Sequence, residues 1–361
     1  MSLKVFLVIL LFSSSSFSSY KFETVLDNLD DAWSFEFLSE DKILFTEMPG
    51  KLKIASLVDK SIVEIKNVPS VQYGGQGGLS EVVLDPNFKS NNMIYLSYSA
   101  KNKNGKSTLF LSSAELINNT LVNTKIIFEA IAPRRTPVHL GAKIAFLNDG
   151  TILLTSGDGF DYREKAQELD NHFGKIIRIN KDGSIPSDNP FINVQNALPD
   201  IYSYGHRNMQ GLLVTKSGEI YEHEHGPRGG DEINLIEPSL NYGWPAITYG
   251  IDYSGAVISP FTEKVGMEQP LLQWTPSIAP SDMIFYEKNV YPELKNSFLV
   301  TALVSRDVKK VTFKNGTNIQ ETLFSELETR LRNIQASPNG IIYLLTDGPK
   351  GKLIKVLPKE L

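Results

Sequence analysis

The chain contains no cysteine. It therefore forms no disulfide, has no thiolate for catalysis or metal binding, and offers no cysteine for lipid attachment. Exported domains with a small core usually depend on disulfides for stability. With 361 residues, 41% of them hydrophobic, this chain is long enough to be stabilised by a large packed core instead.

Other features that would indicate a function class are also missing. No Lys/Arg-rich run stands out and the formal net charge is −5, which argues against a nucleic-acid partner. The sequence has neither a G-x-S-x-G nucleophile elbow nor a P-loop. After the N-terminus no segment is long and apolar enough to cross a bilayer, so we expect no membrane span in the mature chain.

The N-terminus has the pattern of an export signal. Lys4 supplies a positive charge, residues 5–12 (VFLVILLF) form a short apolar run, and Ser16-Phe17-Ser18 has the small-x-small form of a cleavage site. The alternative, a buried strand, is disfavoured because the run does not alternate with polar residues. We predict a signal peptide over residues 1–19, a mature chain of one domain over 20–361, and a periplasmic or secreted location.

The mature region predicts an all-β fold. Polar turns with Gly or Asp precede short runs rich in Ile, Leu, Tyr and Thr, as in residues 148–158 (NDGTILLTSGD) and 337–347 (SPNGIIYLLTD). The motif recurs at intervals of roughly 45 to 70 residues, and propeller blades take about 40–50. The spacing predicts a β-propeller of six or seven blades. A pair of irregular β-sandwiches is the alternative, but the repeats span the whole chain without a linker.

Two segments combine glycine with side chains suited to chemistry. Residues 73–79 (YGGQGGL) place Gln76 among glycines that permit close approach to a ligand, although an interblade turn would look similar. Residues 134–141 contain His139, one of five histidines in the chain. A histidine can take a proton near neutral pH, but a single histidine is more often structural.

Two further segments indicate anion and cation binding. Residues 204–211 (YGHRNMQG) present Arg207 and Asn208, which suit a carboxylate or quinone oxygen, or equally a surface salt bridge. In residues 223–232 (HEHGPRGGDE), His223 and His225 share one strand face and suggest zinc. No third zinc ligand is evident, and the Gly-Pro turn with two acids fits calcium better.

Taken together, these segments resemble the soluble pyrroloquinoline-quinone (PQQ)-dependent aldose (glucose) dehydrogenases. The similarity extends from about residue 24 to the C-terminus. The order and spacing of the matching segments make it specific, whereas each alone is weak. The matching segments are 74–88, 139–146, 166–179, 183–191, 204–211, 224–235, 241–245, 276–286 and 330–334.

The resemblance implies a six-bladed propeller that oxidises the C1 hydroxyl of an aldose to a lactone. His139 resembles the general base, which takes the hydroxyl proton while hydride passes to the quinone. The residues that resemble quinone-binding positions are Gln76, Arg207, Asn208, Arg330 and Arg332. Those that resemble calcium ligands are the carbonyls of Gly226 and Pro227 and, at a second site, Glu232 and the Tyr242 carbonyl. The implied partners are a small aldose and an electron acceptor of unknown identity.

The sequence departs from the family pattern at four positions. Val138 replaces an aspartate next to the base, so a partner that orients His139 is missing at that position. Leu140 and Lys143 replace a Phe and an Arg. Val304 stands where the family usually has a lysine that contacts the cofactor.

Two other functions remain open at this point. A non-catalytic propeller of the same lineage could bind a sugar or protein after losing the cofactor, as Val304 suggests, although the retained His139 and arginines argue against it. A calcium-dependent lactonase is the third candidate, and it would leave the quinone-binding arginines unexplained.

Overall fold

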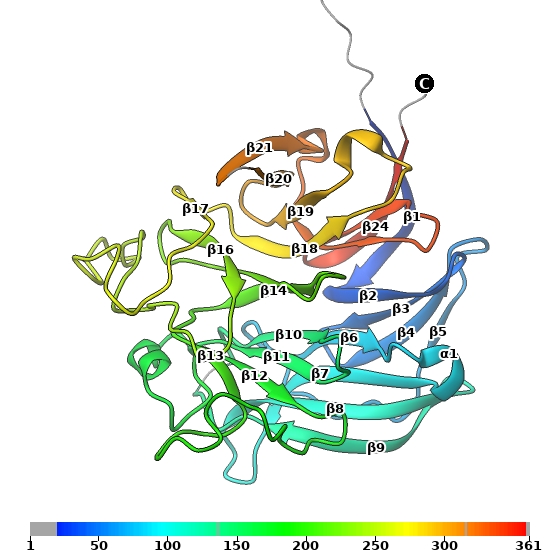
Figure 1. Ribbon diagram of the computed structural model, residues 1–361. Helices are drawn as coiled ribbons and strands as arrows, with labels where there is room; N and C mark the ends of the chain where they lie inside the picture. Colours follow the sequence, from blue (N-terminus) through cyan, green and yellow to red (C-terminus); the bar gives the residue numbers. More distant parts are fainter. Residues whose placement is uncertain (1–19, 136, 315, 359–361) are drawn as a thin grey trace, which may run out of the picture.

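The computed structural model describes residues 20–358 apart from 136 and 315. Its strands form six four-stranded antiparallel sheets arranged in a ring, a six-bladed β-propeller (Figure 1). The predicted all-β fold and the six blades are confirmed. Within the described residues, no helix is long and apolar enough to cross a membrane. The predicted signal peptide, residues 1–19, lies outside the described part of the chain.

The first three blades follow one another along the chain. Blade 1 contains β2 (Ala32–Ser39), β3 (Lys42–Glu47), β4 (Lys51–Ser56) and β5 (Ile62–Glu64). Blade 2 contains β6 (Leu79–Leu84), β7 (Met93–Lys101), β8 (Ser107–Ile117) and β9 (Thr120–Glu129). Blade 3 contains β10 (Gly141–Phe146), β11 (Ile152–Ser156), β12 (Lys175–Ile179) and β13 (Ile201–Tyr204).

The last three blades complete the ring. Blade 4 contains β14 (Met209–Val214), β15 (Ile220–Glu224), β16 (Asp231–Ile236) and β17 (Leu272–Trp274). Blade 5 contains β18 (Pro280–Tyr286), β19 (Ser297–Ala302), β20 (Val308–Lys314) and β21 (Thr317–Leu323). Blade 6 contains β22 (Leu331–Ala336), β23 (Ile342–Thr346), β24 (Pro349–Leu357) and β1 (Lys21–Asp30). The short helices are α1 (Phe88–Asn91), η1 (Arg163–Gln167), η2 (Pro292–Leu294) and η3 (Ser325–Leu327).

The two ends of the chain close the ring. β1 pairs with β24 as the outermost strand of blade 6, so the N-terminal strand completes the sheet made by the last three strands (Figure 1). The first strand of each blade lies innermost and contacts the first strands of its two neighbours, β22 and β2 included. Apolar clusters fill the spaces between blades, because each sheet must bury its faces against the next.

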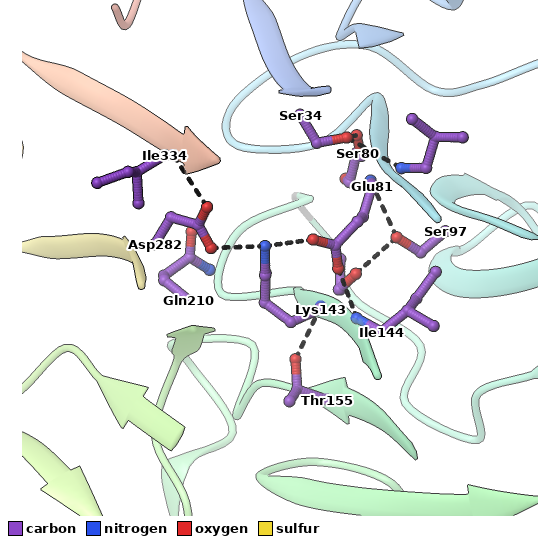
Figure 2. A network of polar contacts seen from close by, with 12 residues as sticks. Ser34, Ser80, Glu81, Ser97, Lys143, Ile144, Thr155, Gln210, Asp282 and Ile334 are labelled. Atoms are coloured by element: carbon purple, nitrogen blue, oxygen red, sulfur yellow. Dashed lines mark hydrogen bonds and ion pairs between the residues drawn. The ribbon is translucent and has the colours of Figure 1, made fainter. Parts of the chain in front are cut away.

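A network of charged side chains lies among the innermost strands (Figure 2). The Lys143 ammonium on β10 is ion-paired with Glu81 on β6 and lies 2.9 Å from the Asp282 carboxylate on β18. Asp282 also accepts the Ile334 N–H on β22, and Glu81 accepts the Ile144 N–H. Burial would lower the pKa of Lys143, but Asp282 and Glu81 raise it, so the lysine is charged. Lys143, a departure from the family pattern, therefore ties three blades together.

Candidate active site

The predicted site residues come together at one end of the ring. Neighbouring strands are antiparallel, so the start of each innermost strand and the end of each second strand lie at the same end of the blade. Gln76, His139, Arg207, Asn208 and Arg330 precede innermost strands. Gly226, Pro227 and Val304 follow second strands. The propeller therefore gathers residues up to 254 positions apart in sequence.

His139 forms a pair with an aspartate from the neighbouring loop. The His139 Nδ1 lies 2.7 Å from the Asp158 Oδ1. The second carboxylate oxygen of Asp158 accepts the Trp244 indole N–H at 2.8 Å, so the carboxylate is held from both sides. With Nδ1 committed to Asp158, Nε2 is the nitrogen available to take a proton. Both His139 and Asp158 line a cavity of about 260 Å³.

The electrostatics of this pair keep the histidine neutral and the aspartate ionised. Burial lowers the pKa of His139, Asp158 opposes this shift, and Arg207 and Arg134 add to it. Burial alone would raise the pKa of Asp158, but the hydrogen bond with His139 and the nearby Arg207 lower it overall. A neutral imidazole next to a fixed carboxylate is the arrangement required of a general base.

The backbone around His139 is fixed by three contacts. His139 has a φ of 47°, a left-handed conformation that is uncommon for a residue with a Cβ. Its N–H donates to the Gln76 side-chain oxygen at 2.8 Å. The buried Arg134 guanidinium donates to the carbonyls of His139, at 3.4 Å, and Gly157, at 2.8 Å. A Cβ at Gly157 would clash with the His139 carbonyl, so the chain can pass here only as glycine.

A second cavity, of about 400 Å³, opens at the end of the ring beside His139. Its lining includes Gln76, Asn208, Arg330 and Arg332, four of the five predicted quinone-binding residues. Ser80 and Gln210 also line this cavity. Both are drawn in Figure 2, so the cavity lies beside the charged network of the innermost strands.

Two arginines and an aspartate that pairs with them line one side of this cavity. Arg330 Nε and Arg332 NH2 lie 2.7 and 2.5 Å from the two oxygens of Asp347, which follows β23. Burial would raise the pKa of Asp347, but Arg332 and Arg330 lower it. One carboxylate thus holds two guanidinium groups in place, and their remaining N–H donors suit an anionic ligand.

Arg207, the fifth predicted quinone-binding residue, lines the 260 Å³ cavity with Pro227 and not the 400 Å³ cavity. Its NH1 donates to the carbonyls of His225, at 2.9 Å, and Gly226, at 2.7 Å. Its guanidinium stacks over Trp244, and its buried Nε has no hydrogen-bond partner among the described residues. An unpartnered buried donor on a cation indicates a place for an acceptor from a ligand.

Comparison with known proteins identifies the family. Residues 29–355 match the family model described as glucose/sorbosone dehydrogenase. The chain belongs to this family. The aldose sugar dehydrogenase YliI of Escherichia coli is 35% identical over 346 residues, which is 94% of this chain and 93% of that protein. Quinoprotein glucose dehydrogenase B of Acinetobacter calcoaceticus is 26% identical over 425 residues, 93% and 87% respectively.

A solved structure supports the same assignment. The apo-form of the soluble aldose sugar dehydrogenase from Escherichia coli has a TM-score of 0.90 and 33% sequence identity, covering 94% of this chain and all of that one. Membership of the family makes this protein an oxidoreductase of the aldose dehydrogenase type.

The departures from the family pattern can now be placed. Val138 and Leu140 flank His139, and the partner missing at Val138 is supplied by Asp158 from the next loop. Val304 has 60% of its surface exposed and lines the 400 Å³ cavity, so it is not a core residue. Arg306 is exposed and is not among the residues that line this cavity.

The predicted calcium positions are close to one another. The Gly226 carbonyl already accepts a bond from Arg207, and one lone pair remains for a cation. Pro227 lines the 260 Å³ cavity next to His139. Gly226, Glu232 and Tyr242 together line a cavity of about 10 Å³, enough for one small ion or water.

Several functional positions were missed by the sequence analysis. Asp158 and Asp347 contact the predicted residues from the next loop of the same blade, and Trp244 contacts Asp158 from another blade. Both acids had a local signal, because Asp158-Gly159 and Asp347-Gly348 come directly after strands, where loop residues often carry function. Trp244 had no such signal, since its role depends on which loops the ring brings together.

Proposed function

We propose that the protein oxidises the C1 hydroxyl of an aldose to the lactone, using PQQ with calcium assistance. The observation that carries the proposal is the His139–Asp158 pair, open to one cavity, beside a second cavity lined by Arg330 and Arg332. A base and an anion-binding cavity side by side are what hydride removal from a sugar to an anionic cofactor requires.

The residues fit the cofactor. PQQ carries several carboxylates, and the two arginines and two predicted amides that line the 400 Å³ cavity supply donors for them. The unpartnered Arg207 Nε is a further donor. When bound, PQQ supplies the acceptor for the hydride that leaves C1 of the sugar.

The protein's own residues supply orientation and proton transfer. His139 Nε2 takes the proton from the C1 hydroxyl as the C1 hydride departs, so the hydroxyl carbon becomes the lactone carbonyl. Asp158 holds the imidazole in the tautomer that leaves Nε2 unprotonated, and stabilises the imidazolium that forms. Gln76 and Arg134 hold the backbone that presents His139 to the cavity.

Calcium is proposed at the Gly226 and Pro227 carbonyls, and at a second site formed by Glu232 and the Tyr242 carbonyl. Carbonyl and carboxylate oxygens are the ligands that calcium prefers. A cation near Arg207 needs compensation by negative charge, and the carboxylates of a bound PQQ would provide it.

Reconstitution tests the proposal. Purified protein is stripped with a chelator, then given PQQ, calcium, both or neither, and sugar-dependent reduction of an artificial dye is followed. Activity is expected only when both are present. Full activity with a nicotinamide cofactor, or lactone hydrolysis without the quinone, would overturn it. Binding of a sugar or protein without any dye reduction would favour the non-catalytic alternative.

Export is a separate part of the proposal. The charge, apolar run and small-x-small site of residues 1–19 support cleavage near Ser19 or Tyr20. Expression of the full chain followed by N-terminal sequencing of the protein from periplasm and medium tests it. An uncleaved chain retained in the cytoplasm would contradict it.

A further inference from the structure

Three buried side chains near the cofactor cavity form a cluster that the proposed mechanism does not use. His206, Glu222 and Glu224 each present one ligand atom, and these atoms lie within 4.8 Å of one another. His206 Nδ1 is 3.5 Å from a Glu224 oxygen and 3.8 Å from a Glu222 oxygen. None of the three has more than 4% of its surface exposed.

The fold places these groups together through strand alternation. Glu222 and Glu224 are two residues apart on β15, so both side chains project from the same face of blade 4. His223, between them, projects from the opposite face, so the His223–His225 zinc arrangement, which the sequence disfavoured against calcium, is not part of this cluster. His206 reaches the glutamates from the loop between β13 and β14, directly before Arg207.

Two polar atoms in the cluster lack partners. Among the described residues, neither His206 Nδ1 nor Glu222 Oε2 has a hydrogen-bond partner. The opposite atoms are engaged: His206 Nε2 is 2.9 Å from the Ser203 hydroxyl, and Glu222 Oε1 accepts the Asn234 amide at 2.8 Å. If Nε2 donates to Ser203, Nδ1 carries a free lone pair directed at the glutamates, as in histidines that bind metals.

The cluster is also short of positive charge. Glu232 on β16 is paired with Glu224 in the strand register, so three carboxylates share this buried region. Two nearby cations direct their donors elsewhere: Lys175 Nζ donates to three backbone carbonyls, and Arg207 NH1 to two. Buried carboxylates that lack a cation are unfavourable unless they bind a proton or a metal ion.

We propose that His206, Glu222 and Glu224 bind one divalent transition-metal ion, with Zn²⁺ as the first candidate. An imidazole nitrogen favours zinc over calcium, and carboxylates are accepted ligands of zinc. Ligand atoms around a tetrahedral zinc are roughly 3.3 Å apart for bonds of about 2.0 Å, close to the separations seen here. A fourth position remains for a second carboxylate oxygen or a water.

The site uses different ligands from the calcium positions, although Glu224 lines the same 10 Å³ cavity as Gly226, Glu232 and Tyr242. Glu224 also accepts the Arg207 backbone N–H at 2.9 Å, so an ion held by His206 and Glu224 would fix the segment that carries Arg207 and Asn208. The site is separate from PQQ and needs neither the quinone nor calcium, so it can be tested without any assay of sugar oxidation.

The test is metal binding by the full chain. The protein is dialysed against a calcium-selective chelator, and its metal content is measured by elemental analysis. About one zinc per chain is expected to remain. Metal-free protein is then titrated with Zn²⁺ against a chromophoric zinc indicator. Glu222→Gln keeps an oxygen that can accept the Asn234 amide, but it removes the negative charge of the ligand. It should weaken zinc binding at least tenfold, since loss of a group that only supports a metal ligand already lowers metal affinity by about 10–100-fold.

Glu232→Gln is the matched control. It removes a carboxylate from the adjacent strand without removing a proposed zinc ligand, and should weaken zinc binding less than Glu222→Gln does, because only a nearby charge is lost. Should Glu222→Gln fail to fold, Co²⁺ substitution of the unmodified protein gives the answer, since a nitrogen–carboxylate site of low coordination produces visible absorption bands. Absence of zinc binding and of these bands, retention of calcium in place of zinc, or equal zinc binding by Glu222→Gln would overturn the proposal.

Discussion

The chemistry of the site depends on the protonation of one side chain, His139. A base that must accept a proton has to be neutral before the reaction, and burial together with two arginines keeps the imidazole neutral. Asp158 acts in the opposite direction by favouring the protonated form. Before the reaction, burial and the arginines keep the imidazole neutral. After it has taken the proton, Asp158 stabilises the imidazolium.

Replacement of His139 tests the base. His139→Ala should reduce turnover by about 10²–10⁴-fold, the usual contribution of general-base assistance, while PQQ binding is retained. The control is His172→Ala, because His172 forms another buried pair, with Asp200, outside the cavities. Turnover and quinone titration are measured for both. Near-normal turnover of His139→Ala at neutral pH would show that His139 is structural.

Replacement of Asp158 tests the orientation of the base. Asp158→Asn should lower kcat by about 10²–10⁴-fold, because the asparagine does not fix the tautomer or stabilise the imidazolium. Asp158 raises the pKa of His139, so its loss lowers that pKa further. Activity requires the neutral base, and the acid limb of the pH profile should therefore move to lower pH. A limb that moves to higher pH in a kcat/KM profile would contradict this assignment.

Val304 tests the quinone cavity. The side chain is exposed and lines the cavity, so a lysine can be accommodated without a core rearrangement. Val304→Lys should tighten PQQ binding about tenfold or more, since a hydrogen bond to a charged group contributes about 1.5–3 kcal/mol. Val304→Met is the control of similar length without charge. Equal quinone affinities of the two variants would show that position 304 does not reach the cofactor.

At the scale of strands, the features that depend on the local sequence pattern could be predicted. Polar turns and β-rich runs identified the strands, and short motifs identified His139 and Arg207. The sequence did not predict partners contributed by the neighbouring strand's loop in the same blade, such as Asp158 to His139 and Asp347 to Arg330, because contacts between loops leave no trace in local periodicity. The charged network around Lys143 was missed because its members lie on three blades.

That network gives a prediction about stability. Lys143→Met leaves Glu81 and Asp282 buried without their cation, which should lower the free energy of unfolding by about 3–5 kcal/mol. The loss should be greater at pH 8 than at pH 5. Burial raises the pKa of Glu81 to about 7 from 4.5 even though Lys143 lowers it. Without Lys143 this pKa rises further, so the variant loses more stability than the unmodified protein as pH rises from 5 to 8.

Urea unfolding at the two pH values measures the effect. Lys216→Met is the control, because Lys216 forms an exposed ion pair with Glu287 and such pairs contribute about 0–1 kcal/mol. If Lys143→Met is as stable as the control at pH 8, the network does not support the ring.

At the scale of the whole molecule, the ring is closed by non-covalent contacts alone, since the chain has no disulfide. β1 brings the beginning of the chain to its end, and Val25, Leu26 and Leu29 on this strand are buried in an apolar cluster with residues of blades 1 and 6. Site residues from five blades depend on this closure, because their positions relative to one another are set only by the packing of the blades.

Leu29 tests whether closure stabilises the ring as a unit. Leu29 is 2% exposed, so Leu29→Ala should lower the free energy of unfolding by about 2–5 kcal/mol through lost burial and a cavity. Thr24→Ala, an exposed position on the same strand, should change the free energy of unfolding by less than about 0.5 kcal/mol.

Because each blade packs on two neighbours, opening at β1 should unfold all blades together. Tryptophan fluorescence, which reports on blades 1 and 4 through Trp33, Trp244 and Trp274, should therefore show the same transition as far-UV circular dichroism. Separate transitions by the two probes in Leu29→Ala would show that blade 6 opens independently and that closure does not hold the site together.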